Sequence, residues 1–175
     1  MSAGRLAPTP SGDLHLGNLT AFYAAWLSAR SSGARLLLRM EDVDTGRSRP
    51  EVEARQRATL RWLGLDWDAE TPRQSERDYT EAIERLAGLT YRCTCSRKAI
   101  REAGGRCAAG CVDHAYESGT LRLAAPREVI TFVDRRHGVQ TVDADAHGHP
   151  VLVRSDGLVA YPLAVVTDDV RDGVT

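Results

Sequence analysis

Apolar and polar positions alternate along the first part of the chain in a way that predicts two strands around one helix. The run from Gly4 to Pro8 has the length of a buried strand and ends where prolines fix the backbone and remove N–H donors. The run RLLLRM from Arg35 to Met40 predicts a second strand. Between them, from Asn18 onward, apolar residues recur with the spacing of one helix face: Leu19, Phe22, Tyr23, Trp26 and Leu27.

Strand, turn, helix and strand in this order predict a βαβ unit, which opens a doubly wound parallel α/β sheet of the Rossmann-like kind. Gly33 suits the C-terminus of the helix. A second helix is predicted to start at a capping box formed by Ser48 and Glu51 and to end before Gly64. A third is predicted over Glu76 to Leu86.

The pattern changes from Thr90 onward. A glycine-rich stretch is followed by the strand-like runs LRLAA, VITFVD and VLVRS, with turn residues between them. We therefore interpret residues 90–150 as an inserted α+β subdomain between residues 1–89 and residues 151–175.

Composition narrows the class of protein. Hydrophobic residues make up 42% and charged residues 27% of 175 residues, as in globular rather than disordered chains. No apolar run approaches the ~18 residues of a membrane span, and the N-terminus lacks a secretory signal, so we expect no membrane association and a cytoplasmic location. The net charge of -1 gives no general signal for nucleic acid. Lys98 is the only lysine, so the basic residues are almost all arginine. Because arginine is so common in this chain, Arg135 and Arg136 are interpreted as surface residues rather than as contacts for nucleic-acid phosphates.

Four cysteines fall within one short stretch, which in a reducing compartment favours a metal over disulfides. Cys93 and Cys95 share a face of an extended strand. Cys107 and Cys111 share a face if their segment is helical, and a loop also brings them together. Four thiolates suit a structural Zn²⁺ site, and four free buried thiols are the alternative.

The turn after the first strand carries a second candidate site. Gly12 and Gly17 allow close approach of the main chain, and His15 adds a side-chain donor at the start of a helix. Phosphate binds at such a position in doubly wound sheets. The alternative is a tight loop with a surface histidine.

The sequence APTPSGDLHLGN resembles the first signature of class I aminoacyl-tRNA synthetases, and RLAPTPSG with LLLRMEDVD resembles their glutamyl branch. Further segments match in the same order: Gln74 to Arg77, Tyr91 to Cys95, and DGLVAYPLAVVTDD from Asp156 to Asp169. Val165 stands where full-length glutamyl-tRNA synthetases typically have asparagine, so the chain is more similar to the glutamyl-queuosine tRNA(Asp) synthetase family.

This resemblance implies ATP-dependent activation of L-glutamate and its transfer to queuosine in the anticodon loop of tRNA(Asp). Two alternatives stay open: a fragment of a glutamyl-tRNA synthetase proper, and a non-catalytic zinc-containing remnant that binds tRNA or another partner. The chain ends before the family's second arginine and its KMSKS-type loop, so we expect a truncated gene product.

The resemblance also implies roles for individual residues. The glutamate pocket would be lined by Arg5, Leu6, Ala7, Pro8 and Thr9, with Arg5 paired with the substrate's side-chain carboxylate. Glu41 would hold the substrate ammonium, and Tyr161 would close the pocket with its hydroxyl. From the residues alone, the alternative for Glu41 is a solvated loop acid and the alternative for Tyr161 is a core aromatic.

The ATP phosphates, with Mg²⁺, would meet His15, Gly17 and Asn18. Residues 1–89 would form the first half of the nucleotide-binding domain and residues 90–150 a zinc-binding, acceptor-type subdomain. The family's usual zinc pattern is Cys-x-Cys followed by Tyr-x3-Cys, so Cys107 stands in place of the tyrosine. Tyr116 or His114 is an alternative fourth ligand.

Overall fold

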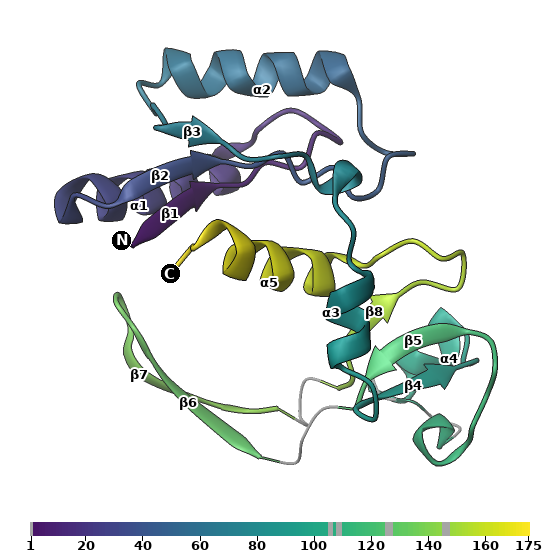
Figure 1. The fold of residues 1–175 in the computed structure, drawn as a ribbon. Coiled ribbons are helices and arrows are strands. Elements are labelled where there is room, and N and C mark those ends of the chain that lie inside the picture. Colours follow the sequence, from purple (N-terminus) through teal and green to yellow (C-terminus); the bar gives the residue numbers. More distant parts are fainter. Residues whose placement is uncertain (1, 105–106, 108–109, 125–127, 145–147) are drawn as a thin grey trace. The chain divides into compact units, whose positions relative to one another are not determined.

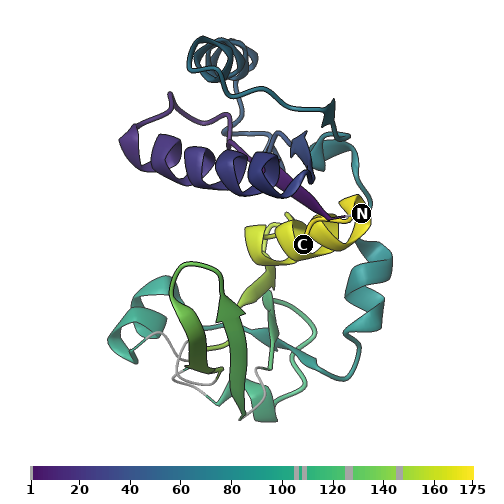
Figure 2. The same ribbon diagram turned by 90° about the vertical axis from the view of Figure 1, so that its left-hand side faces the viewer.

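The computed structural model describes residues 2–104, 107, 110–124, 128–144 and 148–175 (Figures 1 and 2). The chain forms two compact units, one of residues 1–79 with 164–175 and the other of residues 80–163. The division at residues 89 and 150 expected from the sequence stays a prediction. Each unit is described by itself.

The first unit is built on a parallel sheet, as the sequence predicts. The strands β1 (Ala3–Leu6), β2 (Arg35–Leu38) and β3 (Ala69–Glu70) lie in the order β1-β2-β3, and both pairs are parallel. Val174 forms a further parallel bridge with Ala3. Since Ala3 also pairs with Arg35 of β2, β1 is hydrogen-bonded on both sides at its start.

Helix α1 (Leu16–Ser32) connects β1 to β2 and packs closely on them. A Cβ atom at Gly4 would lie only 3.3 Å from the Leu36 side chain and 3.4 Å from Ala29, so glycine permits this approach. Phe22 and Ala29 are the buried residues of the helix, whereas Leu27 is 57% exposed. The predicted apolar stripe was therefore wrong at Leu27, because the small side chain of Ala29 is the one that fits against β1.

Helix α2 (Pro50–Trp62) follows β2 and ends near Gly64, as predicted, but its expected capping box does not form. Arg49 is the N-cap residue and makes no side-chain capping bond. The Ser48 hydroxyl instead donates to the Asp44 carbonyl at 3.1 Å. The Ser48 hydroxyl, which the sequence pattern assigns to the capping box, is therefore bonded within the turn that precedes the helix.

Residues on opposite sides of β1 and β2 meet different helices, because side chains alternate along a strand. Leu6, Leu36 and Leu38 join a hydrophobic core with α1 and with Leu60 of α2. Arg5 and Arg39 instead contact acids of α5 (Tyr161–Asp172). In both views β1 runs between α1 and the C-terminal part of α5 (Figures 1 and 2).

The helix predicted over Glu76 to Leu86 begins later than expected. A 3-10 turn, η1 (Gln74–Glu76), precedes an extended Arg77, and α3 covers only Thr80–Arg85. Arg77 is held by Asp168 and Asp172, at 3.1 and 2.8 Å, which keeps this segment out of the helix. Across the described ranges, no helix combines the length and apolar character needed to cross a membrane.

The second unit contains two antiparallel sheets. The strands β4 (Thr90–Cys93), β5 (Thr120–Leu123) and β8 (Val151–Val153) form one, and the hairpin β6 (Val129–Asp134) with β7 (Gly138–Asp143) forms the other. The three strand-like runs from the sequence are confirmed, while β7 was not predicted. The unit also contains the helices α3 and α4 (Arg97–Glu102) and the 3-10 turn η2 (Cys111–Asp113).

Candidate functional site

The carboxyl ends of β1 and β2 bring two chain segments together. Backbone pairing continues past the strands: the Arg39 N–H donates to the Leu6 carbonyl at 2.9 Å, and the Glu41 N–H donates to the Pro8 carbonyl at 3.0 Å. Ligands of doubly wound sheets bind outside this edge. The pairing therefore places Glu41 beside the segment that carries the predicted pocket residues.

Arg5 and Glu41 form the charged centre of this edge. Arg5 Nη1 lies 3.6 Å from Glu41 Oε1. Glu41 is only 5% exposed, so the alternative of a solvated loop acid is wrong. Burial raises the pKa of the Glu41 carboxyl above its ordinary value, against the opposing charges of Arg5 and Arg39. A guanidinium beside a buried carboxylate is complementary to a ligand that carries both a carboxylate and an ammonium group.

The other predicted pocket residues differ in their access to solvent. Ala7 is half-buried, Thr9 is exposed and Pro8 is buried. Leu6 is fully buried and belongs to the hydrophobic core, so its side chain is not available to a ligand. This difference follows from strand alternation, since Leu6 points to the face opposite Arg5.

Gln56 of α2 holds the segment after β1 in place and was missed by sequence reasoning. Its Nε2 donates to the Thr9 carbonyl at 2.9 Å and to the Gly12 carbonyl at 2.6 Å, and its side chain is buried. A signal was present: Val52, Gln56 and Leu60 share one helix face, so a polar residue sits in a buried apolar stripe.

His15 is the N-cap of α1, which begins two residues before the Asn18 start that the sequence predicts. Its Nδ1 accepts from the Gly17 N–H at 3.1 Å, and its own N–H donates to Asn18 Oδ1 at 3.1 Å. In a neutral imidazole whose Nδ1 accepts, the proton is on Nε2, which is then free to donate outward. A Cβ atom at Gly17 would lie 3.0 Å from the His15 ring, so glycine allows the cap. The three predicted residues thus form one turn, with His15 and Gly17 exposed and Asn18 half-buried, that can present a donor to an anion.

Tyr161 is the first residue of α5 and belongs to the second compact unit. It is 53% exposed, so the alternative of a core aromatic is wrong. Its predicted role at the pocket stays a prediction.

Charged residues behind Arg5 and Glu41 were also missed by sequence reasoning. Arg39 is fully buried and donates from Nη2 to Asp169 at 2.6 Å and to Glu41 at 3.3 Å, and from Nη1 to Asp172 at 3.1 Å. Burial lowers the pKa of Arg39, but these carboxylates outweigh it and the pKa is raised. The available signal was the position of Arg39, which lies in an apolar strand-like run two positions before Glu41.

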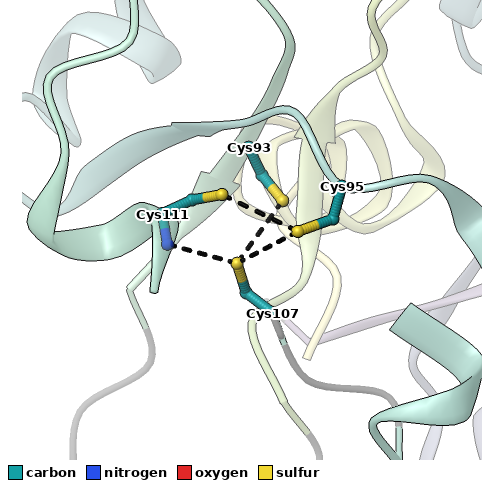
Figure 3. A group of neighbouring side chains, drawn as sticks. All are labelled: Cys93, Cys95, Cys107 and Cys111. Atoms are coloured by element: carbon teal, nitrogen blue, oxygen red, sulfur yellow. Dashed lines mark hydrogen bonds between the residues drawn. The ribbon is translucent and has the colours of Figure 1, made fainter. Parts of the chain in front are cut away.

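The four cysteines of the second unit meet in one cluster (Figure 3). Their Sγ atoms all lie within 4.8 Å of one another, with Cys93 to Cys107 at 3.8 Å, Cys95 to Cys107 at 3.6 Å and Cys95 to Cys111 at 3.7 Å. The N–H of Cys111 donates to the Cys107 sulfur at 3.3 Å, because Gly110 turns the chain in a left-handed conformation. Cys111, at the start of the 3-10 turn η2, therefore lies next to the sulfur of Cys107.

These distances fit a metal. A tetrahedral zinc with Zn–S bonds of about 2.3 Å separates its sulfurs by about 3.8 Å, whereas a disulfide needs about 2.05 Å. Burial raises the pKa of the Cys93 thiol to about 12. The rings of His114 and Tyr116 contact each other at a tilt of 53°, with centroids 5.5 Å apart. Among the described His, Cys, Asp and Glu residues, the group of possible ligands consists of the four cysteines, without His114. The alternative of Tyr116 as a ligand stays a prediction.

Comparisons with known proteins agree with this fold. The family model described as tRNA synthetases class I (E and Q), catalytic domain, matches residues 3–175. The chain is 46% identical to a glutamyl-Q tRNA(Asp) synthetase of Nocardia farcinica, over 98% of this chain and 60% of that protein. It is 45% identical to one of Pseudomonas aeruginosa, over 98% of this chain and 61% of that protein. The chain thus spans about three fifths of the length of these curated relatives.

Solved structures share the fold. A glutamate tRNA ligase of Elizabethkingia meningosepticum, in complex with its amino acid, superposes with a TM-score of 0.77 at 24% identity, covering 99% of this chain and 42% of that chain. A glutamate-tRNA synthetase of Elizabethkingia anophelis gives 0.78 at 24% identity, covering 99% and 43%.

Proposed function

Because the chain belongs to the class I tRNA synthetase family for glutamate and glutamine (E and Q), we propose that it serves ATP-dependent activation of L-glutamate to glutamyl-adenylate. The acceptor is queuosine in the anticodon loop of tRNA(Asp). The printed names of the curated relatives, glutamyl-Q tRNA(Asp) synthetase, support this acceptor over the 3′ end of tRNA(Glu).

The observation that carries the proposal is the pair of Arg5 and Glu41 at the carboxyl ends of β1 and β2. With Nη1 and Oε1 at 3.6 Å, the pair offers a cation for the substrate's side-chain carboxylate and an anion for its ammonium. The substrate's α-carboxylate then stays available for reaction. Ala7 and Thr9 complete this side of the pocket, and Tyr161 closes it.

Activation needs no protein nucleophile. An oxygen of the glutamate α-carboxylate bonds to the α-phosphorus of ATP, and the bond from that phosphorus to the bridging oxygen breaks, so pyrophosphate leaves with the electron pair. His15 Nε2–H, at the start of α1, is the donor for the phosphates, and Mg²⁺ accompanies ATP as part of the substrate. Catalysis is alignment and charge neutralisation.

Zn²⁺ is the metal for the cluster of Cys93, Cys95, Cys107 and Cys111, where four thiolates close a structural site without an open position. Its part is to hold the second unit together. The three-part division, with an acceptor-type subdomain between two parts of the catalytic domain, belongs to the same proposal.

The test is exchange of labelled pyrophosphate into ATP that depends on L-glutamate, on this chain without tRNA. We expect exchange with L-glutamate and none with L-aspartate. A folded sample that neither exchanges nor binds L-glutamate would rule the proposal out. Transfer assays then compare tRNA(Asp) that carries queuosine with tRNA(Glu), and charging of tRNA(Glu) would instead identify a glutamyl-tRNA synthetase fragment.

Two substitutions of His15 are expected to separate capping from phosphate binding. His15→Ala removes both the cap and the ring and should lower the free energy of unfolding by about 1 kcal/mol. His15→Asn restores a capping side chain and should stay within about 0.5 kcal/mol of the wild type. Both should slow pyrophosphate exchange by about tenfold or more, because both lack the Nε2–H donor.

Urea unfolding and exchange rates, measured on the same samples, check this prediction. Full activity in His15→Asn would limit His15 to capping.

Binding of L-glutamate is expected to weaken as the pH falls through the raised pKa of Glu41. A protonated Glu41 cannot pair with the ammonium, and since burial raises this pKa, the loss begins at a higher pH than for an exposed glutamate. Arg5, Arg39 and Asp169 face the group and set the balance of charge around it. Calorimetric titrations between about pH 8 and pH 5 measure the dependence.

Glu41→Gln is the control for this pH dependence. Its weaker binding should stay constant until the ligand's own carboxyl groups titrate, near pH ~4. Parallel profiles for the wild type and Glu41→Gln would show that Glu41 does not meet the ammonium.

A further inference from the structure

Asp169 of α5 binds the side of Arg5 that faces away from Glu41. The Arg5 Nε donates to Asp169 Oδ1 at 2.7 Å, and Nη2 donates to Oδ2 at 3.3 Å. This is a side-on bidentate ion pair, in which the planar guanidinium is held by two bonds rather than one. Arg5 Nη1 is left toward Glu41 Oε1, at 3.6 Å.

Asp169 is itself held in place. Its Oδ1 also accepts from Nη2 of the fully buried Arg39 at 2.6 Å. Arg39 is fixed from its other amino group by Asp172, which in turn binds Arg77 at 2.8 Å. Asp169 and Asp172 lie three positions apart and so share one face of α5. The carboxylates on this face of α5 thus fix the orientation of both Arg5 and Arg39.

The geometry points to Asp169 as a positioning residue of the glutamate pocket. It orients the fork of Arg5 so that Nη1 can receive the substrate's side-chain carboxylate while Glu41 is left for the ammonium. This inference rests on the proposed function, and it adds a residue that acts on the substrate's carboxylate through Arg5 rather than by touching it.

Charge balance explains why the pocket needs this acid. Asp169 and Glu41 are carboxylates that each lie close to both Arg5 and Arg39, whereas Asp172 pairs with Arg39 and Arg77. Without Asp169, Glu41 is the remaining carboxylate near both guanidinium groups. A small rotation of the Arg5 side chain is then enough for a closer ion pair between Arg5 and Glu41. Arg5 and Glu41 would then satisfy each other instead of the ligand.

The experiment compares Asp169→Asn with a matched control, Asp172→Asn. Both remove a carboxylate from the same face of α5, and both carboxylates bind Arg39, but in the described part of the chain Asp172 bonds to Arg39 and Arg77 rather than to Arg5. Kd for L-glutamate is measured by calorimetry, and KM values for L-glutamate and ATP are measured by pyrophosphate exchange.

We expect Asp169→Asn to raise both Kd and KM for L-glutamate by about tenfold or more, and to change KM for ATP by less than about twofold. Asp172→Asn should raise KM for L-glutamate by no more than about threefold. Asp169→Glu keeps the charge that the fold needs but moves the carboxylate by one methylene group, so it should also raise KM for L-glutamate selectively. If Asp169→Asn does not fold, Asp169→Glu is the variant that tests the inference.

Unchanged or tighter L-glutamate binding in the Asp169 variants would overturn the inference and leave the proposed function standing. An equal rise in both KM values would show a merely structural role and overturn it as well. If the wild type neither binds nor activates L-glutamate, the proposed function fails and the inference fails with it. That failure is recognised because it is seen in the wild type and not only in the variants.

Discussion

The Cys111→Ser variant is expected to lose bound zinc and, with it, the fold around the cysteine cluster. Cys111 is fully buried, and its sulfur lies 3.7 Å from that of Cys95. A structural zinc contributes its binding energy directly to folding, so the loss should be on the order of 5 kcal/mol or more for the second unit. Zinc content by atomic emission and hydrogen exchange of β4 and η2 measure the two effects.

Tyr116→Phe is the control for Cys111→Ser. It removes the alternative oxygen ligand and leaves all four thiolates, so zinc content and exchange protection should match those of the wild type. The three tryptophans lie at positions 26, 62 and 67, all in the first unit, so their fluorescence should respond little to either substitution. Full zinc content in Cys111→Ser, or its loss in Tyr116→Phe, would contradict a site of four cysteines.

Local patterns were enough to predict the βαβ start of the fold. The strands around Leu6 and Leu36 and the helix between them follow from apolar runs and periodicity, which act over a few residues. The errors lie where a competing bond, local for Ser48 and distant in sequence for Arg77, overrides the pattern. Ser48 bonds to Asp44 rather than capping α2, and Arg77 is drawn to Asp168 and Asp172, which are more than ninety positions away.

In the candidate site, too, some residues could be predicted from the sequence and others could not. Arg5 lies in β1, Glu41 follows β2 and His15 caps α1, so the resemblance could assign roles to them by position. Arg39 and Asp169 could not be found in this manner, because their meeting depends on α5 packing against the sheet face opposite α1. The cysteine cluster was predictable in membership because all four residues are close in sequence. That the sulfur of Cys107 lies within 4.8 Å of the other three could not be read from the spacing alone.

Replacement of Asp168 by alanine is expected to lower the free energy of unfolding of the first unit by about 3 to 5 kcal/mol. Asp168 is fully buried and accepts from Gln74 Nε2 at 2.9 Å, Tyr79 OH at 2.9 Å and Arg77 Nη1 at 3.1 Å. Burial, together with this carboxylate, raises the pKa of the Tyr79 hydroxyl. Alanine would leave three buried donors without this acceptor and Arg77 with less opposing charge.

The tryptophan fluorescence of the first unit measures this loss during urea unfolding. Asp13→Ala is the matched control, because Asp13 pairs with Arg55 at 2.8 Å but both side chains are more than half exposed. An exposed pair contributes at most about 1 kcal/mol, so this variant should unfold almost as the wild type does. If Asp168→Ala were no less stable than Asp13→Ala, Asp168 would not be the residue that holds the segment from Gln74 to Tyr79. Arg77 would then be held to α5 by Asp172, at 2.8 Å, rather than by Asp168.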